Sequence, residues 1–233
     1  MRLLAIETAT PASSVALAKD RDIVAYAERV DRKGHASFLV PALDFCFEQA
    51  GWSPADLDAV VVDVGPGLYT GIRVGLATAQ ALAAAAGIPV AAAVSLDALA
   101  FRAATGRRHI YSVIDVRRGE VAIATYQPLP GGVVRETQPE IVKPDRMRAL
   151  LESDPSDCLV VGDVGALPSD VLLGLHRCRV GRPRFPAADA LVEITATAVE
   201  KAEFADDVRP LYLREPDVNL DWQSLRPEAP WPQ

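Results

Sequence analysis

Two acidic residues follow apolar stretches at corresponding places in the two halves of the chain. Glu7 comes after Leu3–Ile6, and Asp115 comes after Ile110–Ile114. Carboxylates at the ends of neighbouring strands could hold a magnesium ion and the phosphates of a nucleotide between two lobes. Neither residue has a second acidic residue beside it, and strand-end carboxylates also serve as acceptors for turn hydrogen bonds. Catalysis by Glu7 and Asp115 alone is therefore the weaker interpretation.

A glycine-rich turn lies between an apolar strand and a helix. Val60–Val64 is followed by Gly65-Pro66-Gly67, and Thr70 is placed to cap the helix that comes next. Backbone N–H groups at such a helix start favour phosphates, and Arg73 would add positive charge. However, no Lys-Ser or Lys-Thr follows the glycines, and Thr70 stands in place of the third glycine of the dinucleotide fingerprint. The sequence therefore favours a tight turn over an independent nucleotide site.

Histidine and cysteine are the other residue types with chemistry of their own. No two of the three histidines share a helix face, so we predict no metal ligand. The serines show no nucleophile-elbow pattern, and we predict no catalytic residue. The cysteines have no paired spacing, which is typical of reduced thiols in the cytosol. These residues are His35, His109, His176, Cys46, Cys158 and Cys178.

The composition is that of a mildly acidic globular protein. The 233 residues carry a formal net charge of -7, and the sequence pI is about 5.0. This charge argues against a protein that binds nucleic acid on its own, because phosphate recognition needs a basic surface. Val74–Leu96 is uncharged, but its alanine content and the Gly87-Ile88-Pro89 break favour a helix and a buried strand over a membrane span. We therefore expect a cytoplasmic protein.

The chain consists of two related halves, each opening with three strands in succession. In the first half we expect strands at Leu3–Ile6, Ser14–Ala18, Ile23–Glu28, Val60–Val64 and Val90–Val94, and helices at Ala36–Ala50, Gly71–Ala86 and Ser95–Thr105. In the second half we expect strands at Ile110–Ile114, Val121–Tyr126, Val133–Ile141 and Cys158–Val161, and helices at Asp145–Leu151 and Ala187–Phe204. This order predicts an α/β fold with mixed sheets and a duplicated domain.

Two features of the first half predict a protein partner. The helix at Ala36–Ala50 is apolar around most of its circumference, whereas a helix that serves one core needs a stripe only a little over about 100° wide. Gly67, Gly71 and Gly75 recur every four residues, which costs helix stability but lets another backbone approach closely. Both helices therefore have surface to offer beyond their own sheet.

Several motifs together resemble those of the TsaB (YeaZ) family. They are Leu4–Ala9, His35 before the apolar helix, Gly65–Gly75, Asp115–Val121 and Pro210–Arg214. The resemblance covers nearly the whole chain and implies an actin-like (ASKHA) fold of two ribonuclease-H-like lobes, the second of them reduced. The implied division is an N-terminal lobe with partner-binding helices at 1–106, a smaller C-terminal lobe at 107–214 and a Pro-rich tail at 215–233.

The resemblance also implies a function in tRNA modification. The family belongs to the bacterial pathway that attaches threonylcarbamoyl to the tRNA adenosine adjacent to the anticodon. Its catalytic relative TsaD carries a metal-binding His-x-x-x-His motif after the strand that matches Val90–Val94, where this chain has Ser95 and Leu99. Because neither residue can replace imidazole, the chain resembles a scaffold or activating subunit that is not an enzyme by itself.

The same resemblance implies partners and interface residues. The partners are TsaD in a heterodimer, the ATPase TsaE and, when TsaD is absent, a second copy of the chain. The acidic net charge, rather than the resemblance, argues against direct tRNA binding, so we expect tRNA to be contacted only indirectly. We expect no cofactor on this chain alone, and ATP or ADP at its junction with TsaD. The expected interface residues are His35, Phe38, Leu39, Leu43, Cys46, Gly71, Ile72, Arg73, Gly75, Leu76 and Gln80, and the expected nucleotide-proximal residues are Glu7, Gly67, Thr70 and Asp115. On this view Leu39→Asp or Leu76→Asp abolishes pairing and leaves the fold intact.

Two other functions stay open. An actin-like small-molecule kinase or ATPase would use Glu7 and Asp115 and would bind ATP and magnesium tightly. The second half lacks a glycine-rich adenosine loop, which counts against this function. A metallopeptidase is disfavoured further, because the histidine pair that would hold the metal is replaced by Ser95 and Leu99.

Overall fold

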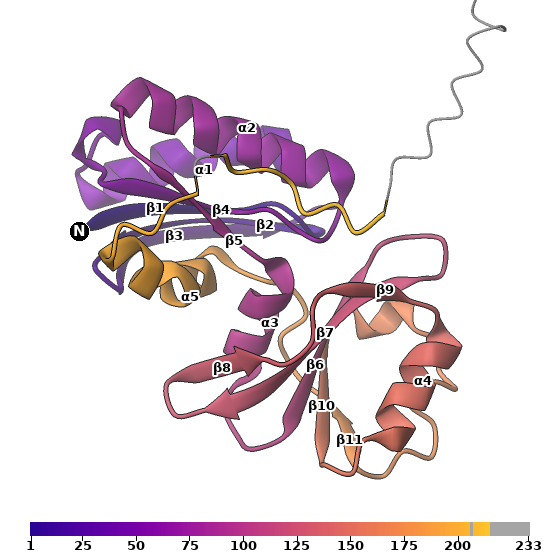
Figure 1. Cartoon of the computed structure of the whole chain (residues 1–233). Coiled ribbons are helices and arrows are strands. Elements are labelled where there is room, and N and C mark those ends of the chain that lie inside the picture. The colour runs from indigo at the N-terminus through magenta and orange to yellow at the C-terminus, as the bar shows by residue number, and fades with distance from the viewer. Residues whose placement is uncertain (206, 215–233) are drawn as a thin grey trace, which may run out of the picture.

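The computed structural model describes residues 1–205 and 207–214. They form two α/β lobes, each built on one β-sheet, and the chain passes between the lobes more than once (Figure 1). The Pro-rich tail expected at 215–233, with Trp222 and Trp231, lies outside the described residues. Within the described part, no helix has the length and apolar character needed to cross a membrane.

The N-terminal lobe is built on a five-stranded mixed sheet with the strand order β3-β2-β1-β4-β5. β1, β2 and β3 are antiparallel, whereas β4 and β5 run parallel to β1. β1 and β4 are the most apolar strands and are buried along nearly their whole length, as central strands covered on both faces must be. The strands are β1 Arg2–Glu7, β2 Ala12–Lys19, β3 Asp22–Val30, β4 Ala59–Asp63 and β5 Val90–Ala93.

Two helices cover one face of this sheet. They are α1 (His35–Ala50) and α2 (Tyr69–Ala86), and the short 3-10 helix η1 (Pro54–Asp56) follows α1. Leu39 of α1 and Leu76 of α2 pack with the apolar side chains of β1 and β4 in one buried cluster. The two helices therefore lie side by side on the sheet, as Figure 1 shows.

The C-terminal lobe repeats the same connectivity. Its sheet has the order β11-β10-β6-β7-β8, with β9 also paired to β7. β6, β7 and β8 are antiparallel, and β10 and β11 run parallel to β6, so the order from β8 to β11 matches the order from β3 to β5. This duplication confirms the expected actin-like α/β fold of two related lobes. The elements are β6 His109–Asp115, β7 Val121–Leu129, β8 Gly132–Arg135, β9 Glu140–Val142, α4 Pro144–Ser153, β10 Cys158–Gly162, η2 Val164–Ala166 and β11 Cys178–Val180.

The remaining two helices are exchanged between the lobes. α3 (Ser95–Ala103) follows the first sheet in sequence, but its Leu96 and Leu99 pack with apolar side chains of β6 and β7. α5 (Ala188–Glu200) lies in the range expected for the C-terminal lobe, yet its Leu191 packs under β1 and β2 of the N-terminal sheet. Packing therefore does not follow a single division of the chain at residue 106, because each lobe takes one helix from the other half.

Three elements differ from the sequence expectation. The single strand expected at Val133–Ile141 is two short strands, β8 and β9, which pair with different parts of β7. Pro139 lies between them and lacks the N–H that a continuous ladder needs. β11 was not expected, since it is only three residues long. α5 ends at Glu200 rather than at Phe204, because the chain turns at Ala202 with φ 54°.

After α5 the chain returns across both lobes. We call residues 207–214 the C-terminal strap, which runs beside α2 toward the junction of the lobes (Figure 1). Val208 belongs to the buried cluster of the N-terminal lobe, and the Leu211 N–H donates to Val64 O at 2.8 Å. Leu213 packs against the C-terminal lobe. The strap therefore ties the two lobes together.

Candidate functional site

The glycine-rich run packs against the end of β1. A methyl group added at Gly71 would lie 2.0 Å from Thr8 O, and one added at Gly75 would lie 2.3 Å from Thr8 Oγ1. Only glycine fits at contacts this short. Thr8 Oγ1 also donates a hydrogen bond to Gly71 O at 2.8 Å. The close approach expected from the glycine spacing is confirmed, but the neighbouring backbone belongs to the chain itself.

The start of α2 differs from the expected phosphate-binding turn. The helix begins at Tyr69, with Leu68 at the N-cap position and no side-chain cap, so the prediction that Thr70 caps it is wrong. Thr70 is exposed in the first turn. A methyl group at Gly67 would lie 2.0 Å from Ala9 O, which also accepts a hydrogen bond from the Leu68 N–H at 2.6 Å. This N–H is thus bonded within the chain rather than free for a phosphate.

Glu7 is buried together with a second carboxyl group that the sequence analysis did not identify. One Glu7 oxygen accepts a hydrogen bond from the Ala9 N–H at 2.8 Å, and the other has no partner among the described residues. Asp63 at the end of β4 accepts hydrogen bonds from Ser95 Oγ at 2.7 Å and from the Gly65 N–H at 2.7 Å. Burial raises the pKa of Glu7, and Asp63 raises it further; burial also raises the pKa of Asp63. Both carboxyls are enclosed and favour protonation.

Asp115 lines a small cavity between the lobes. Its carboxylate accepts a hydrogen bond from the Arg117 N–H at 2.8 Å, which is the turn contact expected for a strand-end acid. Asp115, Thr10 and Asp163 line the cavity, whose volume is about 10 Å³. That space suits about one water molecule and excludes a nucleotide. Glu7 is not in the lining, so the two acids do not form a shared metal and nucleotide site in this structure.

A groove of about 690 Å³ runs between α1 and α2 on the outer side of the N-terminal lobe. Its floor and walls are almost entirely apolar, and Asp44 is the charged residue in its lining. Val40 is 58% exposed, and Phe45 on the outer side of α1 is 48% exposed. The apolar surplus expected for this helix is therefore present at the surface. The lining residues are Val40, Leu43, Asp44, Phe47, Pro54, Ala77, Thr78, Ala81 and Leu82.

Most side chains expected at the partner interface are instead buried in the N-terminal lobe. Helix α1 and helix α2 turn these residues toward the sheet, because the same apolar positions are needed for the chain's own core. Phe38 is half-buried, and Arg73 and Gln80 are exposed. The buried set is His35, Leu39, Leu43, Cys46, Gly71, Ile72, Gly75 and Leu76, of which Leu43 also lines the groove.

His35 has an internal role at the start of α1. Its Nδ1 lies 2.7 Å from Ser13 Oγ, and its Nε2 has no hydrogen-bond partner among the described residues. Burial lowers the pKa of His35, although Asp31 opposes this change. A neutral imidazole wedged between β2 and α2 positions the two elements and does not face the groove.

Comparisons with known proteins identify the chain's relatives. The family model described as "TsaD: tRNA N6-adenosine threonylcarbamoyltransferase" matches residues 28–158. The tRNA threonylcarbamoyladenosine biosynthesis protein TsaB of Escherichia coli is 31% identical over 97% of this chain and 98% of its own length. The chain belongs to the TsaB family. The TsaB protein of Bacillus subtilis is 33% identical over 66% of this chain and 68% of its own length.

A solved structure supports the same assignment. YeaZ from Pseudomonas aeruginosa superposes with a TM-score of 0.75 at 26% sequence identity, covering 91% of this chain and all of YeaZ. The family's place in tRNA threonylcarbamoyladenosine biosynthesis therefore extends to this chain. The match to the TsaD model indicates that the TsaB-family chain shares its central region with the transferase family.

Ser95 and Leu99 both have structural roles in this TsaB-family chain. The Ser95 hydroxyl donates to the Asp63 carboxylate, and Leu99 is fully buried in the cluster between α3 and the C-terminal sheet. Among residues 1–205 and 207–214, no group of three His, Cys, Asp or Glu side chains is arranged to hold a metal ion. A serine and a leucine held in this way offer no ligand for iron or zinc.

The C-terminal strap contacts the two exposed residues of the expected interface. Arg73 stacks over Tyr69, with 3.8 Å from its guanidinium carbon to the ring centroid, and its Nε donates to Tyr212 Oη at 2.9 Å. Gln80 donates to Val208 O at 3.0 Å.

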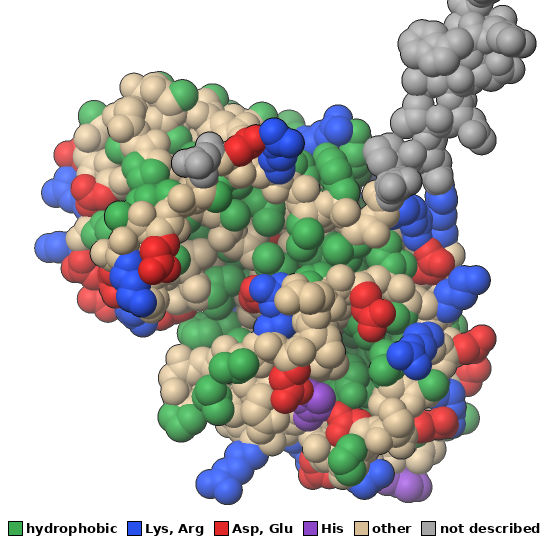
Figure 2. All heavy atoms as spheres, in the orientation of Figure 1, with side chains coloured by type: hydrophobic (Ala, Val, Ile, Leu, Met, Phe, Trp, Pro, Cys, Tyr) green, Lys and Arg blue, Asp and Glu red, His purple; other side chains and the backbone are tan. Residues whose placement is uncertain are grey.

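Figure 2 shows hydrophobic side chains gathered at the junction of the lobes, where a pocket of about 260 Å³ lies. Gly67 is in this pocket's lining together with Val116, whereas Asp115 lines the separate small cavity together with Leu68.

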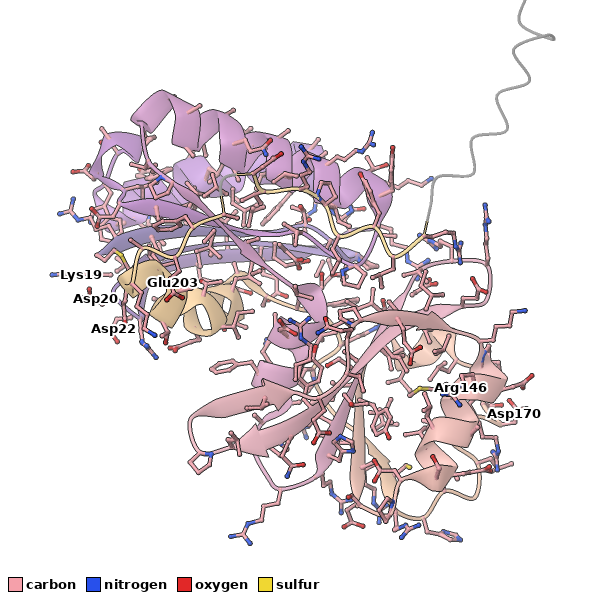
Figure 3. The ribbon with its side chains drawn as sticks, in the orientation of Figure 1. Lys19, Asp20, Asp22, Arg146, Asp170 and Glu203 are labelled. Atoms are coloured by element: carbon pink, nitrogen blue, oxygen red, sulfur yellow. The ribbon has the colours of Figure 1, made fainter. Side chains whose placement is uncertain are left out.

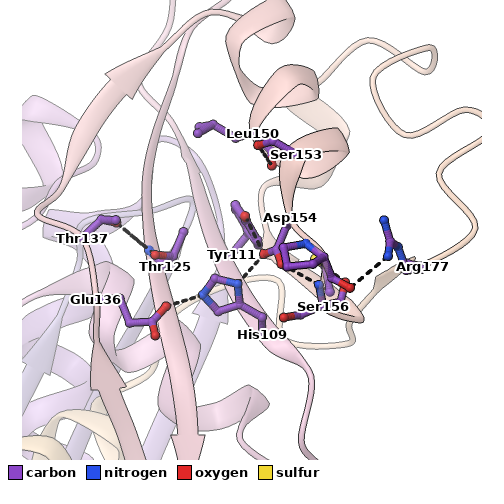
Figure 4. Close-up of polar contacts among 12 residues, drawn as sticks. His109, Tyr111, Thr125, Glu136, Thr137, Leu150, Ser153, Asp154, Ser156 and Arg177 are labelled. Carbon is purple, nitrogen blue, oxygen red and sulfur yellow. Dashed lines mark hydrogen bonds and ion pairs between the residues drawn. The ribbon is translucent and has the colours of Figure 1, made fainter.

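A polar cluster in the C-terminal lobe was not expected from the sequence. His109 contacts Asp154 through Nδ1 and Glu136 through Nε2, the second contact at 2.5 Å, and Tyr111 donates to Asp154 at 2.8 Å (Figure 4). Both ring nitrogens face carboxyl oxygens, so His109 links Asp154 to Glu136. The cluster joins β6 to the end of α4, far from the groove. Its members are too widely spaced along the chain to be recognised as a cluster from the sequence.

Proposed function

We propose that this chain is a non-catalytic, activating subunit of the complex that attaches threonylcarbamoyl to the tRNA adenosine adjacent to the anticodon. It acts by binding TsaD through the groove between α1 and α2. When TsaD is absent, a second copy of the chain occupies the same groove. TsaE is the third protein of the complex, and ATP or ADP binds at the junction with TsaD rather than to this chain alone.

The groove is the observation that carries this proposal. It is apolar, about 690 Å³ in volume and bordered by exposed Val40. Ala77 and Ala81 give α2 a surface of small side chains, so a helix of the partner can approach closely. Apolar surface of this kind on a soluble lobe favours burial by a partner, since transfer from water gains about 25 cal/mol per Å².

The buried acids support a subunit rather than an enzyme. A kinase or ATPase of this fold needs carboxylates that reach magnesium and phosphates. Glu7 is fully enclosed, and the cavity beside Asp115 has a volume of only about 10 Å³. A nucleotide does not fit the cavity beside Asp115 in this structure, so we derive no catalytic step through one there. The same geometry disfavours the alternative of an actin-like small-molecule kinase or ATPase.

A reconstituted modification assay tests the proposed function. Purified TsaD, TsaE, tRNA and threonylcarbamoyl-adenylate are combined with and without this chain, and modified tRNA is measured. We expect product only when the chain is present and no ATP turnover by the chain alone. Equal product without the chain, or ATP turnover by the isolated chain, would contradict the proposal.

A matched pair of variants tests the groove. Ala77→Glu places a carboxylate in the apolar groove near Asp44, whereas Ala84→Glu makes the same change two turns further along α2, beside a separate pocket at Val208. Because an unpaired charge in an apolar contact is costly, Ala77→Glu should weaken TsaD binding on the order of 100-fold. Ala84→Glu should bind within about threefold of the wild type. Equal TsaD affinities of the two variants, measured by isothermal titration calorimetry, would show that TsaD does not bind at the groove.

A further inference from the structure

The edge of the C-terminal sheet carries a basic stretch that the overall charge conceals. Residues 171–188 contain four arginines and no Asp or Glu, in a chain whose net charge is -7. Asp170, which Figure 3 shows beside α4 at the outer side of the lobe, is the last acidic residue before this stretch. The four arginines are Arg177, Arg179, Arg182 and Arg184, and all four are exposed. We call them the arginine edge.

The backbone holds the arginine edge in an extended line. β11 pairs only with β10 among the described strands, so its other side is open. Beyond β11, the Gly181 N–H donates to Val160 O at 2.8 Å, and Pro183 O accepts from the Gly162 N–H at 2.8 Å. From Arg179 to Arg184 an extended chain spans about 17 Å. The arginines are therefore presented along one fixed edge rather than on a loose loop.

The arginine edge lacks the carboxylate partners that other exposed arginines have. Arg2, Arg21 and Arg29 of the N-terminal lobe each lie within 4 Å of an acidic side chain. In the described part of the chain, none of the four arginines has a carboxylate oxygen within 4 Å, although the positive charge of Arg184 acts on Asp163 and opposes the rise in the pKa of that carboxyl. Figure 4 shows one of them, Arg177, which donates to a backbone carbonyl, that of Pro155, at 2.9 Å.

Uncompensated guanidinium groups in a row are suited to a polyanion. Each planar guanidinium can bind a phosphate through two parallel hydrogen bonds. Charged side chains also protect edge strands from pairing with other sheets, but carboxylates would serve that purpose equally and would agree with the sign of the rest of the chain. The single sign, and the lack of ion pairs with the described residues, therefore favour a ligand with several phosphates.

We infer that the arginine edge contacts the sugar-phosphate backbone of the tRNA substrate. The inference rests on the proposed function, because the complex with TsaD brings tRNA to this chain. It replaces the sequence expectation of only indirect contact with tRNA, which rested on net charge. Net charge averages over the whole surface, whereas phosphate contacts depend on charge within about one Debye length, roughly 8–10 Å. The contact carries no sequence specificity, because it involves phosphates rather than base edges.

The test removes the charges of the arginine edge and compares an equal loss elsewhere. The test variant is Arg179→Gln, Arg182→Gln and Arg184→Gln combined, and its matched control is Arg2→Gln, Arg21→Gln and Arg29→Gln combined. Both lose three positive charges; five of the six arginines are exposed, and the side chain of the sixth, Arg2, is 42% exposed. A third variant changes the three test arginines to lysine, which keeps the charge. Fluorescence anisotropy of a labelled, unmodified tRNA transcript measures binding by the full chain in complex with TsaD, at several salt concentrations.

We expect the test variant to bind tRNA roughly tenfold more weakly, with a slope of log K against log salt reduced by about 2 to 3, since each phosphate contact contributes about 0.7 to 0.9. The control and the lysine variant should keep slopes within about 0.5 of the wild type. Equal behaviour of the test and control variants overturns the inference. So does binding of poly-glutamate to the arginine edge without any binding of tRNA, because that result assigns the edge to an acidic protein.

The proposed function and this inference fail in distinguishable ways. TsaD affinity is measured separately for each variant, and the changes at the arginine edge should leave it unchanged. If wild-type chain does not bind TsaD, the proposed function fails, and the anisotropy series is run on the chain alone at low salt. A loss of tRNA affinity confined to the test variant still supports tRNA contact at the arginine edge. An absence of tRNA binding by the wild-type chain overturns the inference.

Discussion

Replacing Asp154 by Asn tests the electrostatics that join α4 to β6. The Asp154 side chain is 7% exposed and is shared by His109 and Tyr111. Burial alone would raise the pKa of Asp154, but hydrogen bonds from His109, the Ser156 N–H and Tyr111 outweigh burial and lower it from 3.8 to about 2. The folded state therefore stabilises the ionised Asp154 carboxylate more than the unfolded chain does.

This pKa difference gives the expected magnitude and its pH dependence. Lowering a carboxyl pKa from 3.8 to about 2 contributes about 2 kcal/mol to the free energy of unfolding. Because the folded pKa is the lower one, this contribution is fully present above about pH 4 and is lost as the pH falls toward 2. Asp154→Asn should therefore cost about 2 kcal/mol at pH 7 and much less near pH 2.

Urea unfolding followed by circular dichroism between pH 7 and pH 2 measures the difference between wild type and variant. Asp157→Asn is the matched control, because Asp157 is 59% exposed and its ion pair among the described residues is with Arg108 on the surface. Such a pair contributes at most about 1 kcal/mol. If Asp154→Asn and Asp157→Asn have the same effect, or if the Asp154→Asn cost does not change with pH, the reasoning is refuted.

Two further predictions concern the packing of the N-terminal lobe. Gly71→Ala should lower the free energy of unfolding by about 2 kcal/mol or more, because the new methyl would lie 2.0 Å from Thr8 O. Gly106→Ala is the control, because open space surrounds its new methyl. Equal melting temperatures of the two variants would contradict the predicted clash. Leu39→Asp should unfold the lobe rather than only abolish pairing, since Leu39 is 1% exposed and the loss exceeds about 3 kcal/mol. Val40→Asp, at a 58% exposed position, should keep the fold and weaken pairing; a folded Leu39→Asp in thermal denaturation would restore the original interface expectation.

The elements of the fold were largely predictable because their signals are local. The apolar strands Leu3–Ile6 and Val60–Val64 differ from the observed β1 and β4 by one residue at each end. The repeated order of three strands predicted the duplication, and the two sheets share one connectivity. Periodicity and turn residues are properties of neighbouring positions, so a single sequence contains them. The break between β8 and β9 was missed because Val133-Val134 and Ile141 were read as parts of one strand, although polar residues and Pro139 separate them.

The candidate site was less predictable because it depends on which face each helix turns to the sheet. Leu39 and Val40 are adjacent and equally apolar, yet one is in the core and the other borders the groove. The glycine face of α2 had the right spacing for close contact, but Thr8 rather than a partner fills it. Sequence periodicity identifies an apolar face and cannot say which of two neighbours covers it.

By itself, the sequence determined the two-lobed α/β fold, the family and the surplus of apolar residues on the first helix, because these depend on composition, motifs and local periodicity. Only the tertiary structure decided that Glu7 is enclosed beside Asp63 and that α3 and α5 are exchanged between the lobes. It also decided that the arginines of residues 177–184 lie along one exposed edge without ion pairs to residues 1–205 or 207–214, although the whole chain is acidic. These features join residues distant in sequence, and their burial and charge exist only once the chain has folded.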